Sequence, residues 1–169
     1  MAAARRVGFA PVVDEGVRVL ILGSLPGDAS LSAGQYYAHP RNAFWRLMEA
    51  VLGVPLTALP YDERLQTLLV HGVGLWDVIA SAERQGSLDT AIRNPEAADL
   101  VALTRRLPAL SVVAFNGGAA ARAGRRILQG VTTAALLDLP SSSPAHARPL
   151  EEKLARWSDL SPYLTAAGG

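Results

Sequence analysis

The sequence predicts an α/β protein with three layers, α/β/α, around a central four-stranded parallel sheet. The first observation is a nearly continuous apolar run from Val17 to Leu22, interrupted only by Arg18, which is typical of a strand buried on both faces. The second is that further apolar runs follow along the chain, separated by segments of helical periodicity. Such alternation implies right-handed crossovers and a parallel sheet, for which we expect the strand order 2-1-3-4.

Composition favours one domain that covers residues 1–169. The chain is 50% hydrophobic and 18% charged, which is enough apolar material for a sizeable core. Its formal net charge of +1 provides no global field for nucleic acid, so local arginines would have to hold such a partner. The absence of cysteine excludes disulfides and thiol chemistry. No run approaches the roughly 18 apolar residues that a membrane span needs, so we expect a cytoplasmic monomer with no membrane partner.

The first half of the chain divides into an arm, a strand, two helices and a second strand. The arm should pack on an edge of the sheet. Apolar residues spaced three and four apart predict the first helix, and Gly53 supplies its stop. The expected elements are the arm at 9–13, a strand at 17–22, helices at 42–52 and 61–70, and a strand at 73–79.

The second half begins with a polar stretch, 81–95, which is too long for a tight turn and is therefore a candidate functional loop. Pro95 suits the first position of a helix, with Asn94 as its cap. The closing helix should turn Leu150, Leu154, Trp157 and Leu160 inward. The expected elements are helices at 95–107, 119–128 and 149–164, strands at 110–115 and 132–139, and a loop at 140–145.

Polar residues follow each predicted strand, and the carboxyl ends of parallel strands are where ligands bind in open α/β sheets. The set contains amides, hydroxyls, a carboxylate and a histidine, without a cluster of metal-ligand spacing, so we expect no metal. A triad of Ser24, His146 and Asp77 lacks the spacing of a nucleophile elbow. The glycine loop, Gly23-Ser-Leu-Pro-Gly27, lacks the Lys-Ser/Thr ending of a nucleotide-binding P-loop.

Five segments carry a resemblance to a known family. They are Leu22-Gly-Ser-Leu-Pro-Gly27, Tyr37-Ala-His-Pro-Arg-Asn-Ala-Phe-Trp45, Trp76-Asp77, Phe115-Asn116-Gly117 and Ser141-Ser-Ser-Pro144. The sequence resembles the uracil-DNA glycosylase superfamily and, within it, is most similar to the hypoxanthine-DNA (deoxyinosine) glycosylase branch. The resemblance covers nearly the whole chain. The fold that it implies, a four-stranded parallel sheet between helices, agrees with the fold expected from the apolar pattern.

The resemblance implies roles for individual positions. Asn42 takes the catalytic position of this branch, whereas Leu25 stands where uracil-excising relatives often have an Asp or Asn that positions the attacking water. Tyr37 corresponds to the aromatic residue that stacks on the flipped base. Asp77 stands where many relatives have a base-reading Asn. The resemblance therefore implies a site for a base, with these residues: Gly23, Ser24, Leu25, Tyr37, Asp77 and Asn116.

A second set of positions corresponds to DNA contacts. It consists of His39, Arg41, Ser141, Ser142, Ser143, Pro144 and His146. In the superfamily the loop at 141–146 pinches the DNA backbone and offers the residue that fills the gap left by the base. This chain departs from the pattern, because relatives commonly have a bulky residue or an Asn near Ala145 and His146.

Structural roles remain open for the same residues. Asn42 could cap the helix that follows it, a role that asparagine performs well and that is compatible with catalysis. Tyr37 could be a packing residue, and Asp77 could cap or pair with Arg84. His39 and His146 could be plain loop residues.

The function implied by the resemblance is that of a monofunctional DNA glycosylase. It would excise deaminated bases, deoxyinosine first and deoxyuridine second, from DNA without a cofactor. The chain has a single lysine, Lys153, which falls in the predicted closing helix and not at a strand end, so no Schiff-base lysine is expected. The alternative is a non-catalytic DNA- or nucleotide-binding module that keeps the fold.

Overall fold

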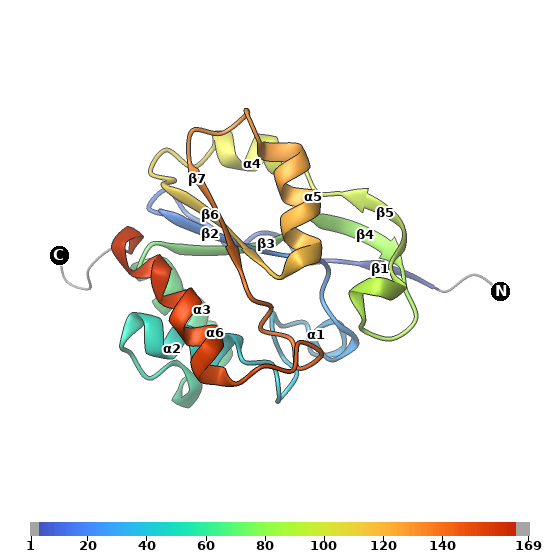
Figure 1. Ribbon diagram of the computed structural model, residues 1–169, viewed down its shortest axis with the longest axis horizontal. Coiled ribbons are helices and arrows are strands. Elements are labelled where there is room, and N and C mark those ends of the chain that lie inside the picture. The colour runs from blue at the N-terminus through green and yellow to red at the C-terminus, as the bar shows by residue number, and fades with distance from the viewer. Residues whose placement is uncertain (1–3, 165–169) are drawn as a thin grey trace.

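The computed structural model describes residues 4–164 and centres on a parallel sheet of four strands. The strands are β2 (Val19–Gly23), β3 (Val73–Asp77), β6 (Val112–Asn116) and β7 (Ala135–Leu139). Their order is β3-β2-β6-β7, and each neighbouring pair is parallel (Figure 1). The predicted strand order 2-1-3-4 is therefore confirmed.

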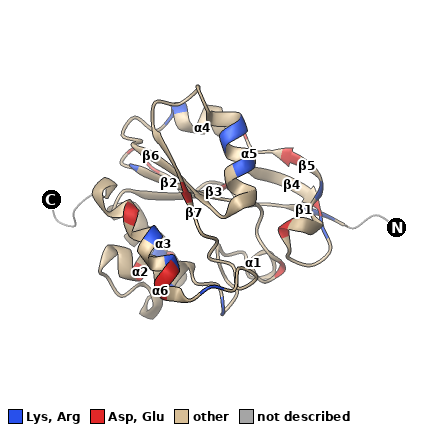
Figure 2. Ribbon diagram, viewed as in Figure 1, with Lys and Arg blue, Asp and Glu red and all other residues tan. Residues whose placement is uncertain are grey.

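Helices cover both faces of this sheet, as the predicted three layers require (Figure 1). Their bounds are α1 (Asp28–Ala33), α2 (Phe44–Leu52), α3 (Tyr61–Val70), α4 (Leu100–Arg105), α5 (Gly118–Leu128) and α6 (Leu150–Trp157). Short 3-10 turns lie at Leu56–Ala58, Asp89–Ala91 and Ser158–Tyr163. In Figure 2 basic residues lie along α5 and both signs of charge lie on α6, so neither sign dominates this view.

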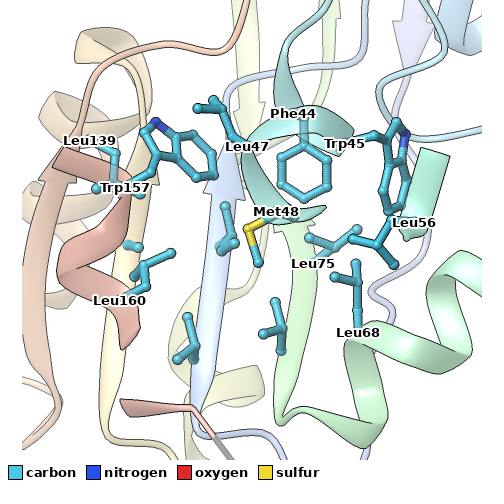
Figure 3. Close-up of a cluster of buried hydrophobic side chains, with 14 of the residues drawn as sticks. Phe44, Trp45, Leu47, Met48, Leu56, Leu68, Leu75, Leu139, Trp157 and Leu160 are labelled. Carbon is cyan, nitrogen blue, oxygen red and sulfur yellow. The ribbon is translucent and has the colours of Figure 1, made fainter. Parts of the chain in front are cut away.

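The two faces of the sheet carry two hydrophobic clusters because successive strand residues point in opposite directions. Val19 and Ile21 of β2 pack with side chains of α2, α3 and α6. Leu20 and Leu22 pack with side chains of α4 and α5. Figure 3 shows the first cluster, in which Phe44 lies between two tryptophans. Its ring makes edge contacts with Trp45 and Trp157 at centroid distances of 4.9 and 5.8 Å.

A second, antiparallel sheet of three strands was not predicted. It has the order β1-β4-β5, with β1 (Arg5–Val7), β4 (Ile79–Glu83) and β5 (Arg93–Ala97). The predicted loop at 81–95 is shorter than expected, because β4 ends at Glu83 and β5 begins at Arg93, and the predicted helix start at Pro95 is wrong. Proline is tolerated in β5 because this edge strand does not need its missing N–H for the ladder. Helix α4 instead begins at Leu100, where the Asp99 carboxylate accepts from the Ala102 N–H at 3.1 Å.

Smaller differences concern the ends of elements. The short helix α1 was not expected; it ends at Gly34, whose φ of 66° is easily adopted by glycine. The closing helix ends at Trp157 and continues as a 3-10 turn. Leu150, the first residue of α6, is 40% exposed, so its predicted inward position is wrong. Trp157 and Leu160 are buried as expected.

The predicted position of the arm is confirmed. Val12 forms an antiparallel bridge with Leu75 of β3, which is an edge strand of the central sheet. The indole N–H of Trp76 donates to the Phe9 carbonyl at 2.9 Å. Within residues 4–164, none of the helices has the length and apolar character needed to cross a bilayer.

Candidate active site

A cavity of about 450 Å³ lies beyond the carboxyl ends of the central strands. We call one side of it the motif wall, consisting of residues 23–25, Tyr37, Asn42, Asn116 and residues 141–143, and the other side the hairpin wall, consisting of residues 87–90. Asp77 lies at the end of β3 and also faces the cavity. Of the predicted site residues, all line the cavity except Arg41. Arg41 is exposed, and its backbone N–H donates to Nδ1 of His39 at 3.0 Å.

Asn116 holds the motif wall together. Its Oδ1 accepts from the Ser142 N–H at 2.9 Å, and its Nδ2 donates to the Ser142 hydroxyl at 2.9 Å and to the Tyr37 hydroxyl at 3.4 Å. The amide therefore ties the end of β6 to the loop after β7. Gly117 follows with a φ of 97°, and a Cβ atom there would lie 3.0 Å from the Ser141 Cβ. A residue with a side chain would be strained at this turn.

Tyr37 has an unusual backbone conformation for a residue with a side chain. Its φ is 56°, a left-handed conformation that costs on the order of 1–3 kcal/mol and persists where the surroundings enforce it. Its ring stacks on Phe44 at a centroid distance of 3.9 Å and an interplanar angle of 19°. Burial first, and the charge of Asp77 second, raise the pKa of the Tyr37 phenol far above its usual value. Tyr37 is therefore a neutral hydroxyl on a fixed aromatic pair.

Asn42 lies two residues before the start of α2, one residue before its N-cap, Ala43. Its Oδ1 accepts from the N–H of Phe44, the first residue of that helix, at 2.9 Å, so the side chain supports the start of the helix as a cap would. The next residue, Ala43, donates its N–H to the Ser142 carbonyl at 2.9 Å. These bonds fix Asn42 beside the loop after β7. An amide oxygen has two lone pairs, so Oδ1 keeps one for a proton of water.

Asp77 is buried against Gly23, and the two residues are matched in size. A Cβ atom at Gly23 would lie 2.7 Å from Oδ1 of Asp77, so only glycine leaves room for the carboxyl group. The other oxygen, Oδ2, is buried and has no hydrogen-bond partner within residues 4–164. The suggested ion pair with Arg84 does not occur among the described residues.

The pKa of Asp77 is far from its ordinary value. Burial raises it to about 7, assisted by the negative charge of Asp89 and opposed by the Arg84 guanidinium. Burial removes water from the charged form, which is disfavoured unless a partner replaces that water. Near neutral pH, Asp77 is therefore present in both protonation states.

The hairpin wall belongs to the unpredicted small sheet, and a buried arginine fixes it. Arg84 is 1% exposed and donates to the carbonyls of Leu25, Pro26 and Gly86. Ser24 donates its hydroxyl to Asp89 at 2.6 Å. These bonds join the hairpin to the glycine loop of the motif wall.

Arg84 and Asp89 were not among the predicted site residues. The available signal was the polar character of 81–95, which marked it as a candidate functional loop. Its pairing with a strand near the N-terminus left no local trace in the sequence.

The loop at 141–146 is supported from behind by the single lysine. Lys153 is 4% exposed and donates to the Ser143 carbonyl at 3.3 Å. Burial lowers its pKa, and Arg46 adds to this effect. His146 is exposed at the outer end of the loop. Within the part of the chain that the structure describes, no group of three or more His, Cys, Asp or Glu residues could hold a metal ion.

Comparison with known proteins identifies the class. The model of the uracil DNA glycosylase superfamily matches residues 10–161, so the chain belongs to that superfamily. By family membership the chain is thus a DNA glycosylase, and the predicted resemblance to the superfamily is confirmed.

Particular relatives narrow the class. The chain is 40% identical over 157 residues to hypoxanthine DNA glycosylase of Methanosarcina barkeri, covering 92% of this chain and 97% of the relative. It is 39% identical over 150 residues to the protein of the same name from Methanosarcina acetivorans, and the match covers 89% of this chain and 94% of the relative. The solution NMR structure of a candidate uracil DNA glycosylase from M. acetivorans superposes on this chain with a TM-score of 0.84 at 37% identity. The superposition covers 94% of this chain and 97% of that structure.

Proposed function

We propose that this chain is a single-domain, monomeric glycosylase that excises hypoxanthine from DNA, with uracil as a second substrate. The observation that carries the proposal is the cavity at the strand ends, where a buried Asp77 and a half-buried Asn42 face the same space. Relatives named hypoxanthine DNA glycosylase, similar over most of the chain, support the choice of base. We place the activity in base excision repair in the cytoplasm.

Hydrolysis of the N-glycosidic bond determines what the site must supply. The bond between C1′ of the sugar and N9 of hypoxanthine breaks and its electron pair leaves with the base; water attacks C1′ and releases one proton to solvent, and the departed base takes up one proton from solvent. Positive charge develops on the sugar and negative charge on the base, so the site must orient a water molecule and stabilise the base. In this proposal the free lone pair of Asn42 Oδ1 accepts a hydrogen bond from the attacking water.

The target base must leave the duplex before this chemistry can occur. Flipping costs a few kcal/mol, which stacking and hydrogen bonding in the pocket offset. The rigid pair of Tyr37 and Phe44 provides an aromatic surface for the base. Hypoxanthine presents an N1–H donor beside an O6 acceptor; Asp77 faces this edge, and backbone N–H groups of the Gly23 loop donate to it.

The remaining predicted residues contact DNA in this proposal. Ser141, Ser142, Ser143 and Pro144 hold the backbone beside the flipped nucleotide, and His146 extends from the end of that loop. His39 and Arg41 contact phosphate from the opposite segment. Because Lys153 is buried behind the loop and bonded to a carbonyl, it does not attack C1′, and the enzyme leaves an intact abasic strand.

A single-turnover cleavage assay tests the proposal. Duplexes that carry one inosine, uracil or xanthine are incubated with excess enzyme, and abasic sites are revealed with alkali. We expect cleavage of inosine first and uracil second, with no strand nick before alkali is added. Nicking without alkali would contradict the monofunctional mechanism. Binding without cleavage of any duplex would favour the non-catalytic binding module.

A further inference from the structure

We infer that Asp77 reads the flipped base as a neutral carboxylic acid, donating one hydrogen bond and accepting another as an amide would. The inference rests on the proposed function and adds the protonation state of one residue in the same site. A neutral acid presents an O–H donor and a C=O acceptor, and an asparagine presents the same pair.

The packing around Asp77 disfavours its charged form. Oδ2 is buried without a hydrogen-bond partner in residues 4–164, and no cation of that range lies within ion-pair distance. Oδ1 lies so close to Gly23 that the carboxyl group has little freedom to move away. A buried carboxylate without a compensating partner loses its hydration and gains nothing in return. Protonation removes this penalty.

The charged neighbours act in opposite directions. From the hairpin wall, Asp89 raises the pKa of Asp77, whereas Arg84 lowers it, and burial is the largest effect. The net result is a pKa of about 7. The other titratable groups around this side of the cavity are Tyr36, Tyr37 and His39. The pKa of each tyrosine is raised, so both phenols are neutral. The charges that influence Asp77 are therefore those of Asp89 and Arg84.

The reaction itself also favours the neutral form. Negative charge develops on hypoxanthine as the glycosidic bond breaks, and an adjacent carboxylate would repel it. The O–H of a neutral Asp77 would donate to O6, which gains part of that charge, and the C=O would accept from N1–H. No proton is transferred in this step: the proton stays on Asp77, and the electron pair of the broken bond stays on the base. Uracil presents the same pair at O4 and N3–H.

The pH dependence of cleavage tests the inference. Single-turnover rates on the inosine duplex are measured at subsaturating enzyme between pH 5.5 and 8, so that they report the free enzyme. For the parent protein we expect the rate to fall about tenfold per pH unit once the pH exceeds the pKa of Asp77. Asp77→Asn presents the same donor and acceptor at every pH, so its rate should lose this decline, whatever its absolute value. A parent rate that rises with pH through this range would overturn the inference.

A measurement on the free protein separates the inference from folding defects. The folded state keeps the Asp77 proton up to about pH 7, whereas the unfolded state releases it near its ordinary pKa of 3.8. The folded protein therefore binds more protons between these values, and the stability of the parent should fall as pH rises through this window. Asp77→Asn lacks this contribution, so its melting temperature should rise relative to the parent from pH 4 to pH 7.

The matched control is Glu15→Gln, which removes an exposed acid from the turn before β2. Its melting temperature should stay parallel to that of the parent across the same range. If Asp77→Asn also stays parallel, Asp77 is ionised in the folded protein and the inference is wrong. If the melting curves diverge as expected but the parent cleaves neither inosine nor uracil at any pH, the proposed function fails while the protonation of Asp77 stands.

Discussion

The two walls of the cavity are built by different means. In the motif wall, the polar side chains bond mainly to one another and to nearby backbone: Asn116 to Ser142 and Tyr37, and Asn42 to the start of α2. The hairpin wall presents exposed residues and is anchored by the fully buried Arg84, which precedes it in the chain and bonds to carbonyls of the glycine loop. The first wall is fixed mainly by hydrogen bonds between neutral groups. The second depends on a buried charge and a chain reversal.

This difference separates two tasks. Water and the sugar need groups held in position throughout the reaction, because geometry determines how much a catalytic group contributes. The motif wall has that rigidity. The hairpin wall acts on the motif wall through charge, since Asp89 and Arg84 influence the protonation of Asp77 in opposite directions. We therefore expect changes in the motif wall to affect the cleavage rate most, and changes in the hairpin wall to affect stability and pH dependence.

The largest expected effect comes from Asn42→Ala. The substitution removes the oxygen that orients water in the proposed mechanism, and the cleavage step should slow by about 10²-fold or more, about 3 kcal/mol. DNA binding should persist. Loss of the bond to the Phe44 N–H should cost only about 1 kcal/mol of stability. Single-turnover rate and melting temperature measured on the same variant separate the two effects.

Asn42→Asp is the matched control for this experiment. It keeps an acceptor for both the helix N–H and water, so it should melt near the parent temperature and lose less than about tenfold in rate. A folded Asn42→Ala protein that cleaves inosine at the parent rate would remove Asn42 from the mechanism and direct attention to His39, Asp77 and His146.

The next effect, Arg84→Met, tests the hairpin wall. The substitution leaves the carbonyls of Leu25, Pro26 and Gly86 without their donor, and a buried unmet acceptor costs about 1–3 kcal/mol. We expect the free energy of unfolding to fall by about 2 kcal/mol in denaturant titrations. Arg93→Met, an exposed change in the same small sheet, should stay within about 0.5 kcal/mol of the parent. Equal losses in the two variants would mean that Arg84 has no special role.

The same division explains what sequence alone could predict. The central strands and most helices follow from apolar periodicity, which is local, and the residues of the motif wall follow from the strand ends and the family pattern. The small sheet was missed because β1 pairs with β4 although residues 8–78, which include β2 and β3, lie between them; Arg5 stands opposite Glu83. The residues of β5 are all exposed, so no alternation of burial marks it as a strand.

The site was predictable to the same extent. Asp77 and Asn42 could be named, but the protonation of Asp77 depends on Asp89, which reaches the cavity only through the hairpin. Arg41 was predicted as a DNA contact from the family pattern; it is exposed and does not line the cavity, unlike its neighbours His39 and Asn42. Adjacency along a loop does not determine the direction of each side chain.

A third, smaller effect is expected at Leu25, where the two walls meet. Leu25 is 6% exposed and its carbonyl accepts from Arg84. Leu25→Asn would place an amide where uracil-excising relatives have one, so uracil excision should rise while inosine excision is largely retained. Burying the amide should cost about 1 kcal/mol of stability. Leu25→Met is the apolar control and should leave the ratio of the two rates unchanged; a parallel change on both bases in Leu25→Asn would argue against a water-positioning role for this position.

The smallest expected effect joins the two walls. Asp89→Asn removes a negative charge that raises the pKa of Asp77, while the new side-chain oxygen can still accept from the Ser24 hydroxyl. A lower pKa means that Asp77 loses its proton at lower pH, so the alkaline decline in inosine cleavage should move to lower pH. Asp89 is exposed, so we expect its charge to change the protonation free energy of Asp77 by less than about 1 kcal/mol.

Two controls separate charge from loop position. The shift should shrink in 1 M salt, where the screening length is about 3 Å. Ser24→Ala removes the hydrogen bond that Asp89→Asn keeps, leaves the charge of Asp89 in place and should leave the decline unchanged. If both variants shift it equally, the hairpin wall acts on Asp77 through loop position and not through charge.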